Sequence, residues 1–431
     1  MKILIYRWNS YNQNDIESAF KDAGCVCDIF NEKISNYEND PSFCEKLYTI
    51  LKNGKYDFCF SINFFPLISG ACHDTDTLYV SWNCDAPLLA MYHRNVFFDT
   101  NIIFEFDYNN LIEFKNMGVT NIYYLPLAAN VKRYDQLLTK NNPFTEPPLP
   151  KSTDTLHEYT ETDSATYPVQ NFSKPAQPLT GYDISFVGSL YEKNSYDKIQ
   201  SDLPDYLTGY LDGAIFAQTQ VSGGNILENL LTPEICSMIE EITDYKKSDD
   251  SFVTTKKLFS TTVLGFKAAS VTRTNNLNKL SKNFIHKVHL FTDSDTSTLP
   301  LITAHPRVDY LTEMPFIFNK SKININMTIP NISSGLSLRV WDIIGCHGLL
   351  MTDFRPELLN FFKPDEDIVI YEDSNELIDK TSFYLKHDEL RNKVTDNAYK
   401  KVSVLHTTEI RISEIIKTVK HLSLIHISEP T

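Results

Sequence analysis

Residues 331–353 read NISSGLSLRVWDIIGCHGLLMTD and contain a loop, a helix and a strand in succession. Leu336, Val340, Ile343 and Ile344 recur at i, i+4, i+7 and i+8, which predicts one buried face of a helix. The glycines that follow are typical of helix ends, and the apolar run at 349–351 predicts a short buried strand. Such a unit is typical of a protein in which strands and helices alternate.

The polar loop before this helix predicts an anion-binding site. Ser334 and Gly335 precede a helix N-terminus, where backbone N–H groups lack partners and the helix dipole favours negative charge. Arg339 and Asp342 share a helix face away from the apolar stripe. Arg339 offers donors to a phosphate, and Asp342 can accept hydrogen bonds from hydroxyl groups. An ordinary amphipathic helix with a solvated Arg/Asp face explains the same spacing, so both interpretations stay open.

The composition is that of a soluble globular protein. The 431 residues predict two or three domains, with 42% hydrophobic and 22% charged residues. A net charge of −15 argues against a nucleic-acid partner. The eight cysteines are scattered without a CxxC pair, which indicates reduced thiols and a cytoplasmic location. The N-terminal MKILIYRW is too short for a signal peptide, and no apolar run approaches about 18 residues. We therefore expect no transmembrane segment, and peripheral membrane contact stays open.

Strands and helices alternate along most of the chain. Residues 1–138 predict a Rossmann-like domain with strands at 2–6, 25–30, 56–62, 78–82, 101–106 and 121–126, and a helix near 86–92. This domain lacks a GxGxxG motif, so a dinucleotide site there is not expected. Residues 139–180 are rich in Pro, Ser and Thr, which predicts a linker or an insertion, with a lid over an interdomain cleft as the alternative. A second α/β domain at 181–405 has a mostly helical part at 191–283 and strands near 184–187, 286–291, 308 and 323–327.

The segment SGLSLRVWDIIGCHGLLMTDFRPEL resembles the sugar-nucleotide-binding segment of GT-B glycosyltransferases, in the group-1-like branch that includes the CgeB-like (spore-maturation) family. Five further stretches resemble segments of the same family and occur in the same order along the chain: VSWNCDAP, IIFEFDYNNLIEFKNMGVTNIYYLPLA, DISFVGSLYEKNSYDKI, KININMTIPN and SVLHTTEIR. The resemblance implies an α/β GT-B fold, two Rossmann-like domains facing across a cleft. Residues 1–138 would form the acceptor side and 181–405 the nucleotide-sugar side, and a helix at 406–421 would pack back on the first domain.

The resemblance also implies roles for the residues of the first motif. Asp342 aligns with the second acid of the family's E-x7-E motif and would hold the ribose hydroxyls, while Arg339 would serve the diphosphate. The first acid of that motif falls at Ser334, which departs from the pattern and leaves the sugar and the anomeric outcome open. A cation such as Arg339 would stabilise the leaving group in place of a metal ion, so no metal is expected.

Further candidates surround the carboxyl ends of the predicted strands, where ligands of α/β sheets bind. Lys193 could reach a phosphate or be an exposed loop lysine, and Asn324 and Asn326 could bind sugar or base or reflect edge-strand polarity. The nucleotide-sugar-binding candidates are Gly188, Ser189, Lys193, Asn324, Asn326, Ser334, Gly335, Arg339 and Asp342.

Asp85 is the candidate catalytic base, because it follows a strand in the domain expected to face the acceptor. A helix N-cap before Pro87 explains Asp85 equally, and His93 and His73 are weaker candidates. Three acid pairs, at 74/76, 293/295 and 365/367, have the DxD spacing of a metal site, but their loop context indicates solvated turns.

These features predict a metal-independent glycosyltransferase that moves a sugar from a UDP- or GDP-linked donor, a co-substrate rather than a cofactor, to the hydroxyl of a glycan, protein or small-molecule acceptor. The alternatives are a GT-B sugar-nucleotide epimerase and a degenerate, non-catalytic nucleotide-sugar-binding module. The last residues, LSLIHISEPT at 422–431, match a reading frame of a transposase sequencing adapter, so we expect an artefact there rather than a genuine amphipathic tail.

Overall fold

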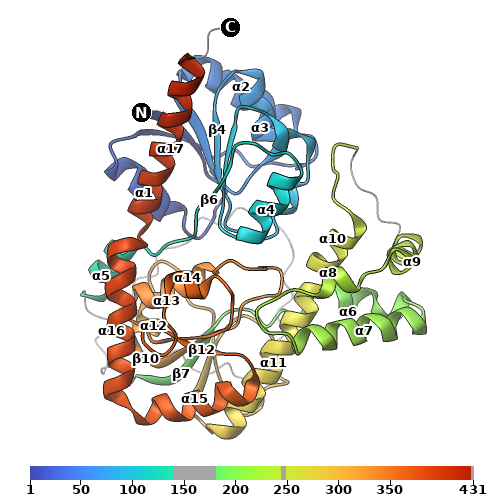
Figure 1. Cartoon of the computed structure of the whole chain (residues 1–431), viewed down its shortest axis with the longest axis vertical. Helices are drawn as coiled ribbons and strands as arrows, with labels where there is room; N and C mark the ends of the chain where they lie inside the picture. The colour runs from blue at the N-terminus through green and yellow to red at the C-terminus, as the bar shows by residue number, and fades with distance from the viewer. Residues whose placement is uncertain (140–180, 244–248, 429–431) are drawn as a thin grey trace.

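The computed structural model of the chain describes residues 1–139, 181–243 and 249–428, with side chains up to residue 422. Most of the segment expected to be a linker, and residues 429–431 of the terminal segment, lie outside the described residues. The described chain forms two six-stranded parallel sheets, one in the N-terminal part and one in the C-terminal part (Figure 1). The prediction of two Rossmann-like α/β domains is confirmed.

The first sheet has the strand order β2-β1-β3-β4-β5-β6. Its strands are nearly continuous apolar runs with helices on both faces, as expected of a buried parallel sheet. For example, all five residues of β3 are buried. The elements are β1 (Lys2–Tyr6), α1 (Gln13–Asp22), β2 (Val26–Phe30), α2 (Pro41–Gly54), β3 (Phe58–Ile62), α3 (Pro66–Asp74), β4 (Tyr79–Trp82), η1 (Leu89–Met91), η2 (Arg94–Phe97), β5 (Asn101–Glu105), α4 (Tyr108–Asn116), β6 (Ile122–Tyr124) and α5 (Val131–Leu138).

The second sheet has the order β12-β11-β10-β7-β8-β9. The strand order reverses between β7 and β10, the place where open α/β sheets bind ligands at the carboxyl ends of their strands. The elements are β7 (Tyr182–Val187), α6 (Ser195–Ile199), η3 (Gln200–Asp202), α7 (Asp205–Thr219), α8 (Leu227–Leu230), α9 (Pro233–Thr243), α10 (Thr255–Phe259), η4 (Ser260–Gly265), α11 (Phe266–Asn283), β8 (Val288–Phe291), β9 (Thr303–His305), α12 (Met314–Lys320), β10 (Ser321–Asn326), α13 (Leu338–Gly345), β11 (Leu350–Asp353), α14 (Leu358–Phe361), β12 (Val369–Tyr371), α15 (Ser374–Lys386), α16 (Asp388–Leu405) and α17 (Thr408–Ser428).

Contacts between the two domains include two at opposite sides of the molecule. The long helix α17 leaves the second domain and packs against α1 of the first (Figure 1). On the other side, the helices between β7 and β8 project from the second sheet, and the segment before α10 returns to the first domain (Figure 1). There the Phe252 amide donates to the Tyr92 carbonyl at 2.9 Å, and Arg94 N donates to Asp250 O at 3.0 Å.

Two secondary-structure predictions are wrong in detail. Only the short 3-10 helix η1 forms in the region expected to be a helix at 86–92, because Pro87 has no N–H to donate and Asp85 does not cap a helix. The strand expected near 308 lies earlier, at β9, since Pro306 cannot continue a hydrogen-bonded strand.

Candidate functional site

A cavity of about 660 Å³ lies at the reversal point of the second sheet. Its floor comes from the segments that follow β7 and β10, its sides from the residues after β8 and β9 and from the start of α13, and Tyr11 of the first domain borders it. Four basic side chains, Lys193, Arg273, Arg307 and Arg339, and three acidic ones, Glu192, Asp293 and Asp342, line it. In a chain with a net charge of −15, this concentration of cations favours an anionic ligand.

Six of the nine nucleotide-sugar candidates line this cavity. They are Gly188, Ser189, Lys193, Asn326, Arg339 and Asp342. An added Cβ at Gly188 would lie 3.5 Å from the Phe186 ring and 3.7 Å from Arg273 Nη1, which are ordinary contacts, so the structure does not require glycine for space at this position. Lys193 is exposed at the rim, and Asn326 is buried with its amide nitrogen donating to Thr352 Oγ1 at 3.0 Å.

The other three candidates lie elsewhere. Asn324 is a core residue whose amide donates to the carbonyls of Phe318 at 3.0 Å and Leu349 at 3.3 Å. Ser334 and Gly335 face the first domain, and their amides donate to Asp107 at 3.0 and 3.1 Å. The anion expected at this loop is thus a carboxylate of the protein itself.

The candidate base Asp85 follows β4, an interior strand of the first sheet, near the carboxyl ends of the strands, and it is exposed. Asn63 Nδ2 donates to its carboxylate at 2.7 Å, so the side chain is held by a neighbouring strand end rather than by a helix N-terminus. Asp85 is not among the residues that line the large cavity. Of the weaker candidates, His73 stacks on Phe98, and His93 Nδ1 accepts from the Asn95 amide at 3.2 Å.

Arg273, on α11, is a site residue that the sequence did not reveal. Its side chain is 9% exposed, and its guanidinium donates to the carbonyls of Ser189 at 2.6 Å and Met327 at 2.7 Å. These carbonyls follow β7 and β10, so Arg273 spans the point where the strand order reverses. The guanidinium lies 4.7 Å from the ring centroid of Tyr191 and 5.3 Å from that of Phe186.

Arg273 forms no salt bridge with an acid in the described part of the chain, although Asp353 lies near enough to act on its charge. Its Nε has no hydrogen-bond partner among the described residues. Burial lowers the pKa of the guanidinium, because desolvation disfavours the charged form. A phosphate in the cavity would supply a counter-charge in direct contact with the guanidinium.

Ser337 is the second residue that the sequence did not reveal. It is the N-cap of α13 and lines the cavity, yet its buried hydroxyl lacks a partner in the described part of the chain. Arg339 follows in the first turn, with its guanidinium 5.3 Å from the ring centroid of Phe318. The N-terminus of α13 and Arg339 thus face the same space as Arg273.

Asp342 is 1% exposed, so the solvated-face interpretation of this helix is wrong. Its Oδ1 accepts from Tyr134 at 2.6 Å and from Tyr310 at 3.1 Å, and its Oδ2 lies 3.5 Å from Arg339 Nη1. Burial raises the pKa of this carboxyl, while Arg339 and the tyrosines oppose the rise. The helix is buried on this side because α5 of the first domain, which carries Tyr134, packs against it.

The acid pairs with DxD spacing do not come together. Asp295 accepts from the Ser297 amide at 2.9 Å in an exposed turn, as expected. Asp293 differs because it lines the large cavity, 3.9 Å from Arg307. Among the described residues, no group of three or more His, Cys, Asp or Glu side chains is placed to hold a metal ion.

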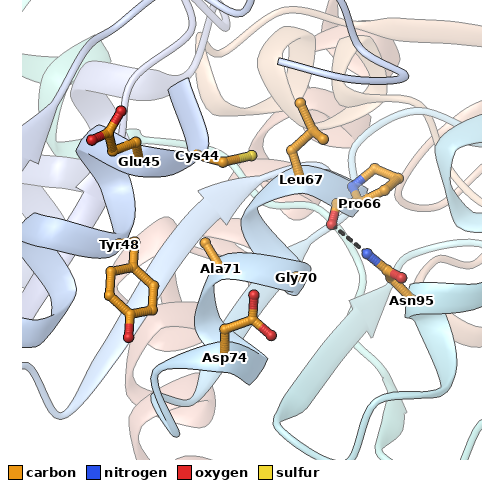
Figure 2. Close-up of a pocket in the computed structure, with 9 residues that line it drawn as sticks. All are labelled: Cys44, Glu45, Tyr48, Pro66, Leu67, Gly70, Ala71, Asp74 and Asn95. Carbon is orange, nitrogen blue, oxygen red and sulfur yellow. Dashed lines mark hydrogen bonds between the residues drawn. The ribbon is translucent and has the colours of Figure 1, made fainter. Parts of the chain in front are cut away.

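A second cavity, of about 390 Å³, lies on the outer face of the first domain between α2 and α3 (Figure 2). Cys44 and Leu67 lie towards one end and Tyr48 and Asp74 towards the other, while Asn95 Nδ2 donates to the Pro66 carbonyl at 2.8 Å. None of the predicted site residues lines it.

Comparison with known proteins supports the fold. A family model described as "Glycosyl transferase-like" matches residues 277–417, which run from the last part of α11 into α17. No curated protein sequence matches the chain. In structure, the chain is similar to sucrose-phosphate synthase from Thermosynechococcus elongatus, with a TM-score of 0.50 and 9% identity over 99% of this chain and 100% of that one.

Two further solved structures are similar at a lower level. They are a glycosyltransferase from Rickettsia africae, with a TM-score of 0.46, 9% identity and coverage of 97% of this chain and 98% of that one, and Anabaena HepE in complex with UDP-glucose, with a TM-score of 0.46, 8% identity and coverage of 98% and 100%. The similarity to sucrose-phosphate synthase over the whole chain shows the GT-B fold, and residues 277–417 match the "Glycosyl transferase-like" family model. No helix in the described ranges is long and apolar enough to cross a membrane.

Proposed function

We propose that this protein is a glycosyltransferase of the CgeB-like branch that moves a sugar from a UDP- or GDP-linked donor to an acceptor hydroxyl. The observation that carries the proposal is Arg273, a buried guanidinium without a carboxylate partner in the described chain, in a cavity at the reversal point of the second sheet. Ser337 and Arg339 at the start of α13 complete a set of donors that suits a diphosphate.

The donor would lie with its diphosphate between α11 and α13. Arg273 and Arg339 would then stabilise the negative charge that develops on the leaving nucleoside diphosphate, a role that a divalent ion has in other transferases. This is why we propose a metal-independent reaction. Asp342, oriented by Tyr134 and Tyr310, would accept a hydrogen bond from a donor hydroxyl through Oδ2.

The acceptor would approach from the first domain, where Asp85 would take the proton of its hydroxyl. The bond from the anomeric carbon to the diphosphate oxygen breaks, and the bond to the acceptor oxygen forms. We place this reaction in the cytoplasm, where sugar nucleotides would serve as donors.

A thermal-shift panel of UDP, GDP and their sugar conjugates, with and without EDTA, tests the donor site, because a ligand of the folded state raises the melting temperature. We expect a shift that persists in EDTA. A shift that requires a divalent ion would contradict metal independence, and no shift with any nucleotide would contradict the donor site. With the nucleotide-sugar identified, sugar conversion without a second substrate would instead indicate an epimerase, and binding without turnover a non-catalytic module.

A further inference from the structure

The first domain holds the loop that leads into α13 through one buried carboxylate. Asp107 Oδ2 accepts from the amides of Ser334 at 3.0 Å and Gly335 at 3.1 Å, and its Oδ1 accepts from Ser334 Oγ at 3.0 Å. Asp107 has no exposed surface. The same Oδ1 caps α4, where it accepts from the amides of Asn109 at 3.0 Å and Asn110 at 3.2 Å. One side chain therefore joins the helix of one domain to the loop of the other.

The fit between the two backbones is close at this point. A Cβ added to Gly335 would lie 2.9 Å from the Phe106 ring and 3.0 Å from Asp107 Cα. Glu357, just before α14, adds a second link, because it accepts from the Tyr108 amide at 2.9 Å and from the Tyr124 hydroxyl at 2.5 Å. The edge of the first domain that carries α4 lies beside the second domain (Figure 1).

The first domain also contacts the other end of α13. Tyr134 donates to Asp342, and a Cβ on Gly345 would lie 2.8 Å from Ala129 Cβ and 2.9 Å from Tyr134 Cδ2. The helix whose N-terminus faces the large cavity is thus held at both ends by residues of the other domain. Its N-terminal turn, with Ser337 and Arg339, cannot move independently of the first domain while these contacts persist.

We propose that Asp107 is a positioning residue for the nucleotide-sugar site. By satisfying the amides of Ser334 and Gly335, it fixes the loop so that Ser337 and Arg339 face the cavity, and it makes donor affinity depend on contact between the domains. This inference rests on the proposed function, since it concerns the same site. Asp107 does not touch the cavity, so it acts through α13.

Asp107→Asn separates the two roles of this side chain. Asparagine keeps an oxygen for the α4 amides and is itself a good N-cap, so α4 should remain intact. Its amide nitrogen replaces the oxygen that faces Ser334 N and Gly335 N, and a donor cannot accept from them. Asp99→Asn is the matched control, because it makes the same change at a side chain of the first domain that is 82% exposed.

Hydrogen–deuterium exchange without nucleotide tests the contact. We expect faster exchange at residues 331–340 in Asp107→Asn, with α4 and the control unchanged. Calorimetric titration with UDP and GDP tests the positioning role, and we expect the dissociation constant to rise by about tenfold, within the usual range of coupling between sites.

Each measurement can contradict a different part of the proposal. Unchanged exchange would refute the contact, and faster exchange with unchanged affinity would refute the positioning role. If the wild-type protein binds neither nucleotide, the proposed function is refuted and the positioning role with it, while the exchange result still decides whether Asp107 holds the loop.

Discussion

The sharpest test of the donor site is Arg273→Met, which removes the buried guanidinium but keeps a long apolar side chain beside Phe186 and Tyr191. In the free protein, Arg273 donates to two carbonyls, while its Nε has no partner in the described residues. A hydrogen bond that involves a charged group contributes about 1.5–3 kcal/mol. Because 1.4 kcal/mol corresponds to a factor of ten, loss of one such bond to a diphosphate should weaken binding by about tenfold to about a hundredfold.

The stability of the free protein should change much less. Methionine leaves the carbonyls of Ser189 and Met327 without this donor. It also removes a buried charge, whose desolvation lowers the pKa of Arg273 in the wild type. Taking an ion out of water costs several kcal/mol, and this cost is absent from the variant. At about 1.5–3 kcal/mol each, the two lost hydrogen bonds would by themselves lower the free energy of unfolding by about 3–6 kcal/mol. Because the desolvation cost that is removed is of similar size, we expect the two effects to offset each other to within about 2 kcal/mol.

Calorimetric titration with UDP and GDP, together with urea unfolding, measures both quantities. Lys282→Met is the matched control, because it removes one positive charge from an exposed position on the same helix. A variant that binds either nucleotide with the affinity of the wild type would refute the assignment of the diphosphate to Arg273. Equal losses of affinity in both variants would point to general electrostatic attraction instead of a specific contact.

Three further predictions address the acids. Asp342→Ala should weaken nucleotide binding and, by leaving the Tyr134 and Tyr310 hydroxyls without their acceptor, destabilise the fold by about 1–3 kcal/mol in urea unfolding; unchanged affinity would remove Asp342 from the donor site. Burial raises the pKa of Glu105 from 4.5 to about 8, so the folded protein binds a proton that the unfolded chain releases above pH 4.5. The wild type should therefore lose stability relative to Glu105→Gln as the pH rises from about 4.5 to about 8, with no further change above that, and a difference independent of pH would contradict the shift. Asp85→Asn should slow transfer while nucleotide affinity stays normal, and a fully active variant would exclude Asp85 as the base.

Much of the fold could be predicted because its signals are local. The alternation of apolar strands and amphipathic helices depends on spacing within about twenty residues, and the stripe at Leu336, Val340 and Ile343 is buried as its period predicted. Arg273 could not be found in this way. It lies in a polar stretch of α11, more than fifty residues from α13, and its importance comes from the long-range packing that places it between β7 and β10. Ser337 was missed because a serine before a helix usually bonds to the helix itself.

The loop at 331–335 shows why an anion site is difficult to assign from sequence. Unpaired amides before a helix attract negative charge, but they do so equally for a phosphate of a ligand and for a carboxylate of the protein. Here Asp107 satisfies the amides of Ser334 and Gly335, which do not line the cavity, whereas Ser337, where the chain enters α13, does. Ser334 can therefore stand where the resembled motif has an acid, since a second carboxylate at this position would face Asp107 at hydrogen-bonding distance and repel it. The Asp107 carboxylate therefore accounts both for the serine at this position of the motif and for the contact between the domains.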